Sequence, residues 1–474
     1  MDNILVQKAD YINEDKINDF LRIGVEKAKD KQYIRTIIER ARDARGLSIE
    51  EVAALINVED DNLLEEMYSV AREIKQKIYG NRIVMFAPLY ISDHCVNDCV
   101  YCGYKCSNKD DNGRKKLDKE QIVREVEILE DLGHKRIVLE AGEDPLNCPI
   151  DYVTQCMETV YSVKKDNGSI RRINVNIAAT TVENYSKLKK AGIGTYILFQ
   201  ETYHRETYKR MHPRGPKHDY DYHTTAMDRA MQGGIDDVGI GVLYGLYDYK
   251  FETVAMFMEA KHLDDTFGVG PHTISVPRLR PAAGVDSSNF PYLVNDHDFK
   301  KLVAIIRLAV PYTGMIISTR EESGFRDEII AVGISQVSAG SSVDVGGYEE
   351  EYGKNVKKTS AQFEVNDTRT PIEILKKLCK DGYIPSYCTA CYRQGRTGER
   401  FMSLAKTGNI HNVCLPNAIM TFKEFLLDYA DEELKAIGEK TIEHNFQNIE
   451  SDKIKEETRK RLERISAGER DLYF

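Results

Sequence analysis

Hydrophobic and polar positions follow two different periods along this chain. Up to about residue 80 the apolar residues keep helical spacing: Ser48 and Glu51 form a capping box ahead of the apolar run 52–56, and a second helical run covers 63–78. From about residue 81, short β-branched runs alternate with amphipathic helical segments, which is typical of a parallel sheet covered by helices. Beyond about residue 350 the strand pattern stops and a polar tail rich in Glu and Lys begins. We therefore expect an N-terminal helical segment over 1–80, an α/β unit over 81–350 and a helical C-terminal domain over 351–474.

Eight short runs in the middle of the chain are candidate strands. Eight parallel strands with helical connections close naturally into a TIM-type (β/α)8 barrel, whose loops after the strands carry the chemistry. The predicted fold class is therefore α/β, with a doubly wound open sheet as the alternative. The candidate strands are 83–90, 136–141, 173–179, 195–200, 237–243, 273–277, 314–319 and 333–338.

Composition and charge narrow the function classes. The 66 Lys and Arg and 76 Asp and Glu residues give a net charge of −10, with both signs interspersed, so nothing favours nucleic acid or an anionic membrane as a partner. The first residues have no apolar signal core and no Arg-rich amphipathic pattern, and no stretch is long enough to span a membrane. We expect a cytoplasmic protein. The ten cysteines are too few and too unevenly spaced for a disulfide scaffold, so their clustering indicates metal binding or catalysis.

The first cysteine set follows the first predicted strand. Cys95, Cys99 and Cys102 have the spacing C-x3-C-x2-C. A four-iron cluster normally takes four thiolates, so three would leave one iron open for another ligand. A structural zinc loop is the alternative, and it would need His94 or Cys106 as its fourth ligand.

The second cysteine set lies in the tail. Cys388, Cys391 and Cys414 have the spacing C-x2-C-x22-C, which again supplies three thiolates. Because C-x2-C is a common zinc spacing and His411 lies three residues before Cys414, the spacing alone leaves a zinc knuckle and an iron–sulfur cluster equally open. We interpret two of the other cysteines, Cys156 and Cys379, as small buried apolar residues.

Polar residues also gather where two predicted strands end. Asn174 and Asn176 alternate with apolar residues, so one face of the third strand is polar and is expected to line a cavity. Gln200 and Glu201 follow the fourth strand, at the end where a barrel keeps its site. The alternative is that these groups merely cap their strands.

The first cysteine loop, its place after strand one and the expected barrel resemble the radical S-adenosylmethionine (SAM) superfamily. That resemblance implies a 4Fe-4S cluster whose open iron binds S-adenosyl-L-methionine. The segment from Glu140 to Glu143 resembles the family's Gly-Gly-Glu motif, with Ala141 in place of the first glycine. The resemblance assigns Glu143 to the amino group of the cofactor, and it places four further residues at the cofactor: Tyr104, Asn174, Asn176 and Glu201.

The two cysteine sets together, with the segments 271–278, 317–321 and 387–396, resemble the tyrosine-lyase family of FeFe-hydrogenase maturases. The resemblance implies cleavage of L-tyrosine to p-cresol and dehydroglycine, and conversion of dehydroglycine to carbon monoxide and cyanide for the hydrogenase iron. It also implies an auxiliary iron–sulfur cluster with an extra iron bound through L-cysteine. The implied partners are hydrogenase maturation proteins and an electron donor such as ferredoxin. The thiamine-pathway tyrosine lyase shares barrel and substrate but would lack the tail triad.

The resemblance also suggests roles for individual side chains. Arg320, after the seventh strand, is expected to hold the tyrosine carboxylate, unless it pairs with Glu321 or Glu322. Ser338 and Gln200 complete the predicted catalytic set, and His262, ranked ahead of His272, is expected to bind the extra iron. Two other classes stay open: a thiamine-type lyase with a structural metal in the tail, and a non-enzymatic iron–sulfur electron carrier.

Overall fold

Eight parallel strands close into a barrel in the computed structural model, which describes residues 8–108, 113–285, 290–352 and 361–474. Neighbouring strands follow chain order from β2 to β8, then β8 pairs with β1 and β1 pairs with β2, so the ring is closed. The predicted TIM-type barrel is confirmed, and the open sheet is excluded. The strands are β1 Arg82–Ser92, β2 Arg136–Ala141, β3 Arg172–Asn176, β4 Ile193–Ile197, β5 Val238–Gly241, β6 Thr273–Ser275, β7 Gly314–Ile317 and β8 Gln336–Ser338.

The middle of the barrel is filled by apolar side chains that point inward. Phe86, Val138, Ile197 and Ile316, from β1, β2, β4 and β7, form one buried cluster with Phe199 packed against it. Because side chains in a barrel stack in layers, this cluster separates the two ends of the barrel interior.

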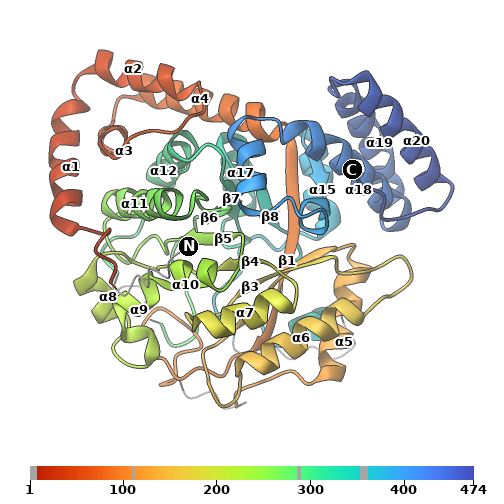
Figure 1. Ribbon diagram of the computed structural model, residues 1–474, viewed down its shortest axis with the longest axis horizontal. Coiled ribbons are helices and arrows are strands. Elements are labelled where there is room, and N and C mark those ends of the chain that lie inside the picture. Colours follow the sequence, from red (N-terminus) through yellow and green to blue (C-terminus); the bar gives the residue numbers. More distant parts are fainter. Residues whose placement is uncertain (1–7, 109–112, 286–289, 353–360) are drawn as a thin grey trace.

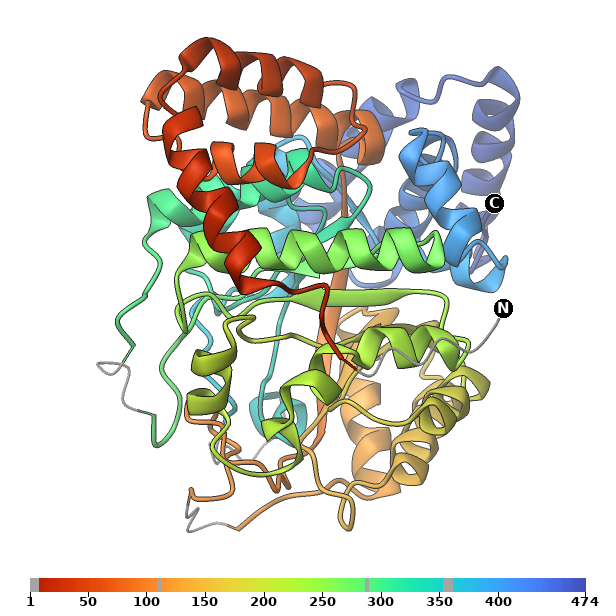
Figure 2. The same cartoon turned by 60° about the vertical axis from the view of Figure 1, so that its left-hand side comes forward.

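Helices surround the sheet, as the alternating pattern predicted (Figures 1 and 2). Their caps come from the sequence: Asp118 and Gln121 form a capping box at the start of α5, and Asn295 caps α12. The surrounding helices are α5 Lys119–Asp131, α6 Ile150–Ser162, α7 Val182–Lys190, α8 Arg205–Met211, α9 Tyr220–Thr224, α10 Ala226–Gln232, α11 Tyr249–Phe267, α12 Asp296–Ala309 and α13 Ser323–Val332, with a short 3-10 turn at Pro216–His218.

The N-terminal helices pack against the barrel's outer helices near the beginning of β1 (Figure 2). The capping box of Ser48 and Glu51 is present at the start of α3, as predicted. Contacts of α1 and α3 with α11, and of α4 with α12, join this segment to the barrel. Its helices are α1 Glu14–Lys27, α2 Lys31–Ala41, α3 Ile49–Leu55 and α4 Asp61–Tyr79.

The tail is helical except for one strand, which corrects the prediction that strands end near residue 350. β9 pairs in parallel with the first residues of β1, Arg82–Val84, and so adds a ninth strand to the barrel sheet. β9 is only three residues long and has Pro385 at its centre, so the sequence has no recognisable strand pattern there. Proline is tolerated in this strand because β9 lies at the edge of the sheet. The tail elements are α14 Gly347–Tyr352, α15 Pro371–Lys380, β9 Ile384–Ser386, α16 Ala390–Arg393, α17 Gly398–Lys406, α18 His411–Asp428, α19 Glu432–Gln447 and α20 Asp452–Ser466.

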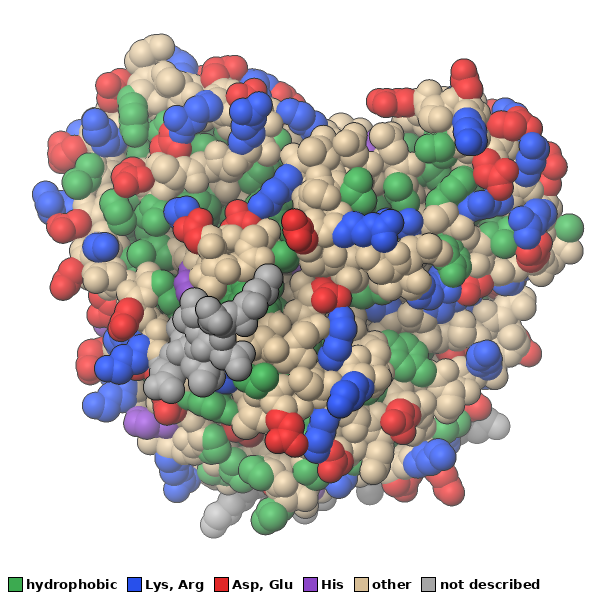
Figure 3. Space-filling view, viewed as in Figure 1, with side chains coloured by type: hydrophobic (Ala, Val, Ile, Leu, Met, Phe, Trp, Pro, Cys, Tyr) green, Lys and Arg blue, Asp and Glu red, His purple; other side chains and the backbone are tan. Residues whose placement is uncertain are grey.

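The surface carries mixed charge. On the face shown in Figure 3, Lys and Arg side chains are interspersed with Asp and Glu, as the sequence pattern indicated. Within the described residues, none of the helices combines the length and the apolar character that a membrane crossing requires.

Candidate functional site

A cavity of about 210 Å³ opens where the barrel strands end. Its floor includes the apolar cluster of Phe86, Val138, Ile197 and Ile316, and its walls come from the loops after the strands. This is the end at which enzymes of this architecture keep their chemistry. We call it the first cavity; its polar lining includes Cys95, Cys99, Cys102, Tyr104, Glu140, Glu143, Asn176, Glu201, Lys217, Arg280, Arg320 and Ser338.

All three cysteines of the first set line this cavity, in the loop that follows β1. The backbone fixes the loop: the amide of Cys102 donates to Cys99 O at 3.1 Å, and that of Val96 donates to Glu143 O at 2.8 Å. Gly142 permits this approach, because a Cβ there would lie 2.4 Å from the carbonyl oxygen of His94. The loop therefore brings three thiols together beside the acidic motif after β2.

Burial keeps these thiols protonated in the absence of a metal. It raises the pKa of Cys99 and raises that of Cys102 to about 11. Metal binding replaces such protons, and nearby N–H groups already face the sulfur atoms: the amide of Tyr104 lies 3.4 Å from Cys102 Sγ. His94 and Cys106, the candidate fourth zinc ligands, are outside the cavity lining, and Cys106 is exposed. The chemistry of the site fits a cluster held by three thiolates.

Four of the five predicted cofactor residues line the first cavity. Glu143 accepts a hydrogen bond from Asn97 Nδ2 at 2.6 Å, and burial raises its pKa. Tyr104 is buried, and its hydroxyl donates to Val343 O at 3.1 Å. The lining also includes Asn176 and Glu201. Asn174 lies one layer deeper in β3, where its Oδ1 accepts from Arg172 Nε and from the amide of Thr195, at 2.9 and 3.1 Å.

Two of the three predicted catalytic residues line the first cavity, and the third does not. Arg320 lines the cavity and stacks on Phe363, with its guanidinium carbon 3.3 Å from the ring centroid. Among the described residues no carboxylate forms an ion pair with it, whereas Glu321 pairs with Arg278 and Arg280. Ser338 also lines the cavity. The remaining member, Gln200, turns away and donates to Thr224 Oγ1 at 2.8 Å.

Three further charged side chains of this cavity, Lys217, Glu140 and Arg280, were not predicted, and the first two bear directly on the site. Lys217 pairs with Glu201 at 2.8 Å, and its amide donates to Asn97 Oδ1 at 2.9 Å. Burial alone would lower the pKa of Lys217, but the charges of Glu201 and Cys99 outweigh it and raise that pKa. Glu140 is the second: burial raises its pKa to about 8, although a hydrogen bond from Asn176 and the charge of Arg320 act in the opposite direction.

A second cavity lies at the opposite end of the barrel, where the strands begin. It is lined by the first residues of β1, β2, β3, β7 and β8 on one side and by the tail on the other. All three cysteines of the second set belong to this lining: Cys388 follows β9, Cys391 lies in α16 and Cys414 in α18. β9 therefore places the second set beneath the barrel.

The sulfur atoms of the second set are close enough to interact. A hydrogen bond from the Cys414 thiol is the main cause that lowers the pKa of Cys391, and the same bond raises the pKa of Cys414. Arg396 also donates to Cys391. A thiolate is thus stabilised here without a metal, which suits a site that collects iron.

Of the four histidines considered for metal binding, His94 belongs to the first cysteine loop, and only one of the other three lines the second cavity. His272 does so, with its Nε2 3.3 Å from the Tyr392 hydroxyl and its Nδ1 3.5 Å from Asp237 Oδ1. His262 lies on α11 instead, stacked on Tyr11 and bonded through Nε2 to Asp228 at 2.8 Å. The ranking of His262 ahead of His272 is therefore corrected, because His262 belongs to the outer helix layer. His411, the candidate zinc ligand, lies against Gly80 outside the lining.

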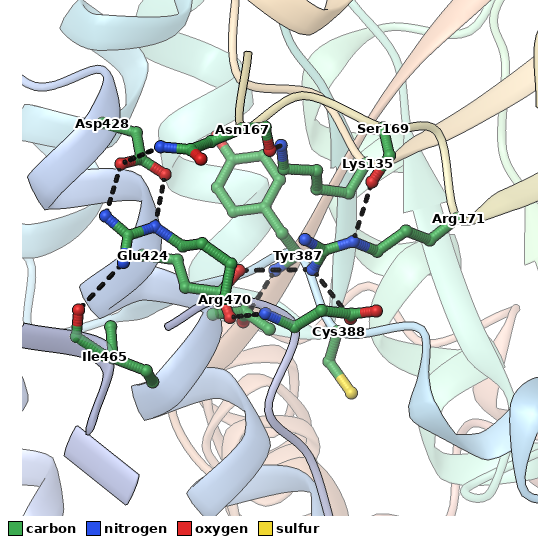
Figure 4. Close-up of polar contacts among 12 residues, drawn as sticks. Lys135, Asn167, Ser169, Arg171, Tyr387, Cys388, Glu424, Asp428, Ile465 and Arg470 are labelled. Carbon is green, nitrogen blue, oxygen red and sulfur yellow. Dashed lines mark hydrogen bonds and ion pairs between the residues drawn. The ribbon is translucent and has the colours of Figure 1, made fainter. Parts of the chain in front are cut away.

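Polar contacts fasten the tail to the barrel beside Cys388 (Figure 4). Arg171, just before β3, pairs with Glu424 of α18 at 3.2 Å. Asp428 of α18 accepts from Asn167 Nδ2 at 3.2 Å and pairs with Arg470 at 2.6 Å. These contacts hold the helix that carries Cys414 against the start of the barrel strands.

Comparisons with known proteins agree with this arrangement. The family model of the Radical SAM superfamily matches residues 89–260, and that of the Biotin and Thiamin Synthesis associated domain matches residues 275–384. A crystal structure of HydG, a maturase of the FeFe-hydrogenase, is 65% identical, covers 98% of this chain and 100% of its own, and superposes with a TM-score of 0.94. The FeFe-hydrogenase maturase HydG from Carboxydothermus hydrogenoformans is 37% identical, with coverages of 95% and 99% and a TM-score of 0.80. The 2-iminoacetate synthase of Salmonella typhimurium is 31% identical over 352 residues, which are 73% of this chain and 89% of that protein.

Proposed function

Because this chain belongs to the HydG family of FeFe-hydrogenase maturases within the radical SAM superfamily, we propose that it is a lyase that cleaves the Cα–Cβ bond of L-tyrosine. The products of this step are p-cresol and dehydroglycine, and dehydroglycine is converted to carbon monoxide and cyanide for the hydrogenase iron. The observation that carries the proposal is the placement of two three-cysteine sets in two cavities at opposite ends of one barrel.

The chemistry of the relatives and the atom balance support this reaction. The compound in the name 2-iminoacetate synthase is dehydroglycine, so that relative is named for the proposed first product. Tyrosine has the composition of p-cresol plus dehydroglycine, and dehydroglycine has that of carbon monoxide, hydrogen cyanide and water. The carbon skeleton balances without oxidation or reduction, but the hydrogen atom taken from tyrosine leaves with 5′-deoxyadenosine. The electron donor therefore supplies one electron for the cleavage of SAM, and a second electron, with a proton, completes p-cresol.

The first cavity fits a 4Fe-4S cluster and SAM. Cys95, Cys99 and Cys102 would hold the cluster, and Glu143 would accept a hydrogen bond from the cofactor's amino group. Lys217 places a positive charge beside the thiolates. When bound, this pair supplies the 5′-deoxyadenosyl radical that removes a hydrogen atom from the substrate amine.

The same cavity offers a binding mode for tyrosine. Arg320 presents a guanidinium fork that matches a carboxylate, and the ring of Phe363 fixes its plane. Phe363 is itself held by the segment after residue 360, which a buried ion pair between Arg326 and Asp367 anchors at 2.7 Å. Ser338 adds a hydroxyl group to the same wall. Together they orient the carboxylate end of the substrate.

The second cavity supplies the site for the later step. Cys388, Cys391 and Cys414 would hold the auxiliary cluster, and His272 is the histidine placed to bind the extra iron, with L-cysteine as a further ligand. Hydrogenase maturation proteins would receive the product, and a ferredoxin-like protein would supply electrons.

The direct test is an anaerobic assay of the reconstituted protein with tyrosine, SAM and dithionite. Chromatography should detect p-cresol, and deoxyhaemoglobin should trap carbon monoxide. If no p-cresol were formed, the proposed lyase function would be wrong.

Formation of p-cresol without carbon monoxide would favour the second candidate, a thiamine-type lyase. The relation to 2-iminoacetate synthase is the observation that keeps this candidate open. The polar cavity beside the first cysteine set argues against a simple electron carrier.

Replacing Arg320 with lysine is expected to raise the tyrosine KM or slow p-cresol formation by at least about tenfold. The substitution keeps the charge but removes the bidentate fork and the stack on Phe363. Steady-state kinetics give the effect, and uncoupled release of 5′-deoxyadenosine should persist. Unchanged tyrosine kinetics would show that another group holds the carboxylate.

Tyrosine binding is expected to weaken as pH rises through about 8, the pKa of Glu140. Below that pH the buried carboxyl is protonated and neutral; above it, its negative charge competes with the substrate carboxylate for Arg320, and Glu201 adds like charge. The tyrosine KM measured from pH 7 to 9 should therefore rise in the wild type, and the rise should be absent in Glu140→Gln. The same rise in both proteins would assign the effect to another group.

A further inference from the structure

Three arginines line the barrel side of the second cavity. Arg82, Arg136 and Arg172 stand at the first positions of three neighbouring strands, β1, β2 and β3. Arg136 and Arg172 are register partners in the sheet, so their backbones lie side by side. A layer of guanidinium groups thus faces the tail cysteines across the cavity.

Arg136 and Arg172 are buried and Arg82 is partly buried, and within the described residues no Asp or Glu forms an ion pair with any of the three. Buried Arg278 and Arg326 have such a partner. Buried Arg229 and Arg307 donate to backbone carbonyl oxygens instead. Arg136 donates to Cys388 O at 2.7 Å, and Arg172 donates to Asn174 Oδ1 at 2.9 Å and Thr195 Oγ1 at 2.6 Å. The Nε atoms of Arg82 and Arg136 have no hydrogen-bond partner.

Buried cations of this kind need a counter-charge. Arg136 and Arg172 are register partners on adjacent strands, so their like charges are held close together. Facing them are Asp237, which lies beside His272, and the three cysteines. An oxidised four-iron cluster held by three thiolates would carry one net negative charge. Together with Asp237 it would balance two of the three guanidinium charges and leave the third unbalanced. One small anion would complete the balance.

The position of the arginines and the size of the second cavity indicate what kind of anion would bind there. The arginines lie on the barrel side of the cavity and the thiols on the tail side, so a carboxylate bound to the guanidiniums would lie beside the cysteines. The second cavity, at about 40 Å³, is much smaller than the first, at about 210 Å³, which favours a small anion.

We propose that Arg82, Arg136 and Arg172 form a carboxylate-binding site for an α-imino or α-amino acid of two or three carbons. This inference rests on the proposed function, in which cleavage of tyrosine leaves a two-carbon fragment that keeps its carboxylate. Arg320 holds that carboxylate before cleavage, and the guanidinium layer holds it afterwards, beside the auxiliary site.

Glycine is a suitable probe, because it has the two-carbon carboxylate skeleton and is not cleaved. Calorimetric titration of glycine into anaerobically reconstituted protein should show binding to the wild type and at least about tenfold weaker binding to Arg82→Gln. Arg82 is the preferred site for substitution, because among the described residues its side chain stacks on Tyr79, and its Nε has no hydrogen-bond partner there. Arg136→Gln should show the same loss, and iron content and circular dichroism confirm that both variants are folded.

Two matched variants locate the binding. Arg393→Gln removes an arginine of the tail that does not line the second cavity and that pairs with Asp471. This variant should bind glycine with wild-type affinity. In a Cys99→Ser background, where only the tail set holds a cluster, glycine should shift the electron paramagnetic resonance signal of that cluster.

Unchanged affinity in Arg82→Gln and Arg136→Gln would overturn the proposal, as would affinity lost in Arg320→Lys but kept in Arg82→Gln. A wild-type protein that makes p-cresol but binds no glycine would also overturn it, while the lyase assignment stands. Arginine-dependent glycine binding in a protein that makes no p-cresol would support the carboxylate site and remove only the lyase assignment.

Discussion

Replacement of Cys99 by serine is expected to reduce the reductive cleavage of SAM to the background level. Cys99 is the middle member of the first set and is 7% exposed. A cluster held by only three thiolates loses a third of its anchors when one sulfur is removed, and a buried hydroxyl is a poor substitute for a thiolate towards iron. The cluster should be lost or displaced from Glu143 and Lys217, which line the same cavity.

Release of 5′-deoxyadenosine under dithionite measures this effect. Cys106→Ser is the matched control, because Cys106 lies four residues after Cys102 but is exposed and outside the cavity lining. The control should cleave SAM at the wild-type rate. Near wild-type release from Cys99→Ser would refute the assignment of the first set to the cofactor.

The double replacement Cys388→Ser and Cys391→Ser is expected to remove carbon monoxide formation and to leave p-cresol formation largely intact. Tyrosine meets the cofactor at the end of the barrel strands, whereas these cysteines lie beneath the strand starts. β1 has 11 residues, so the two ends are separated by roughly 36 Å of strand. Capture of dehydroglycine needs a metal site with an open position, and the second cavity is where such a site would be.

Carbon monoxide can be trapped with deoxyhaemoglobin while p-cresol is quantified in the same reaction. Cys379→Ser is the control, since Cys379 is a buried cysteine of the tail that is absent from the lining of the second cavity. It should leave both products at wild-type yield. If p-cresol and carbon monoxide fell together in the double variant, the second set would be needed for folding or tyrosine binding, as a structural zinc site would be.

The barrel was predictable because its strands are buried on both faces. Such strands read as β-branched apolar runs, and each of the eight lies within a few residues of its predicted position. β9 has no such run, because its three residues gain their place only by pairing with Arg82–Val84. Long-range pairing of this kind leaves no local pattern in a sequence.

Site residues were predictable where they follow a strand. Glu143 and Arg320 do so, Ser338 is the last residue of β8, and all three line the first cavity. Gln200 and Glu201 show the limit of this reasoning: adjacent residues at a strand end point to opposite sides, and only Glu201 faces the cavity.

Other residues needed the tertiary structure. Lys217 lies at a short turn after α8, remote from any strand, and reaches the site only because that loop folds over the cysteine loop. His262 and His272 are both polar residues near helix or strand ends, and only the packing of helix layers separates them. The arginine layer was hidden because the three arginines lie far apart in the sequence and meet only across the sheet.

The length of β1 links the two ends of the molecule mechanically. Its first three residues pair with β9, which leads directly to Cys388, and its last residue is Ser92, three positions before Cys95. A hydrogen-bonded strand in a closed sheet is stiff along its axis, so a shift of the tail that displaces β9 is transmitted along this strand to the loop at the other end. We therefore expect that occupancy of the second cavity influences the geometry of the cysteine loop at the first, and by linkage the influence would run in both directions.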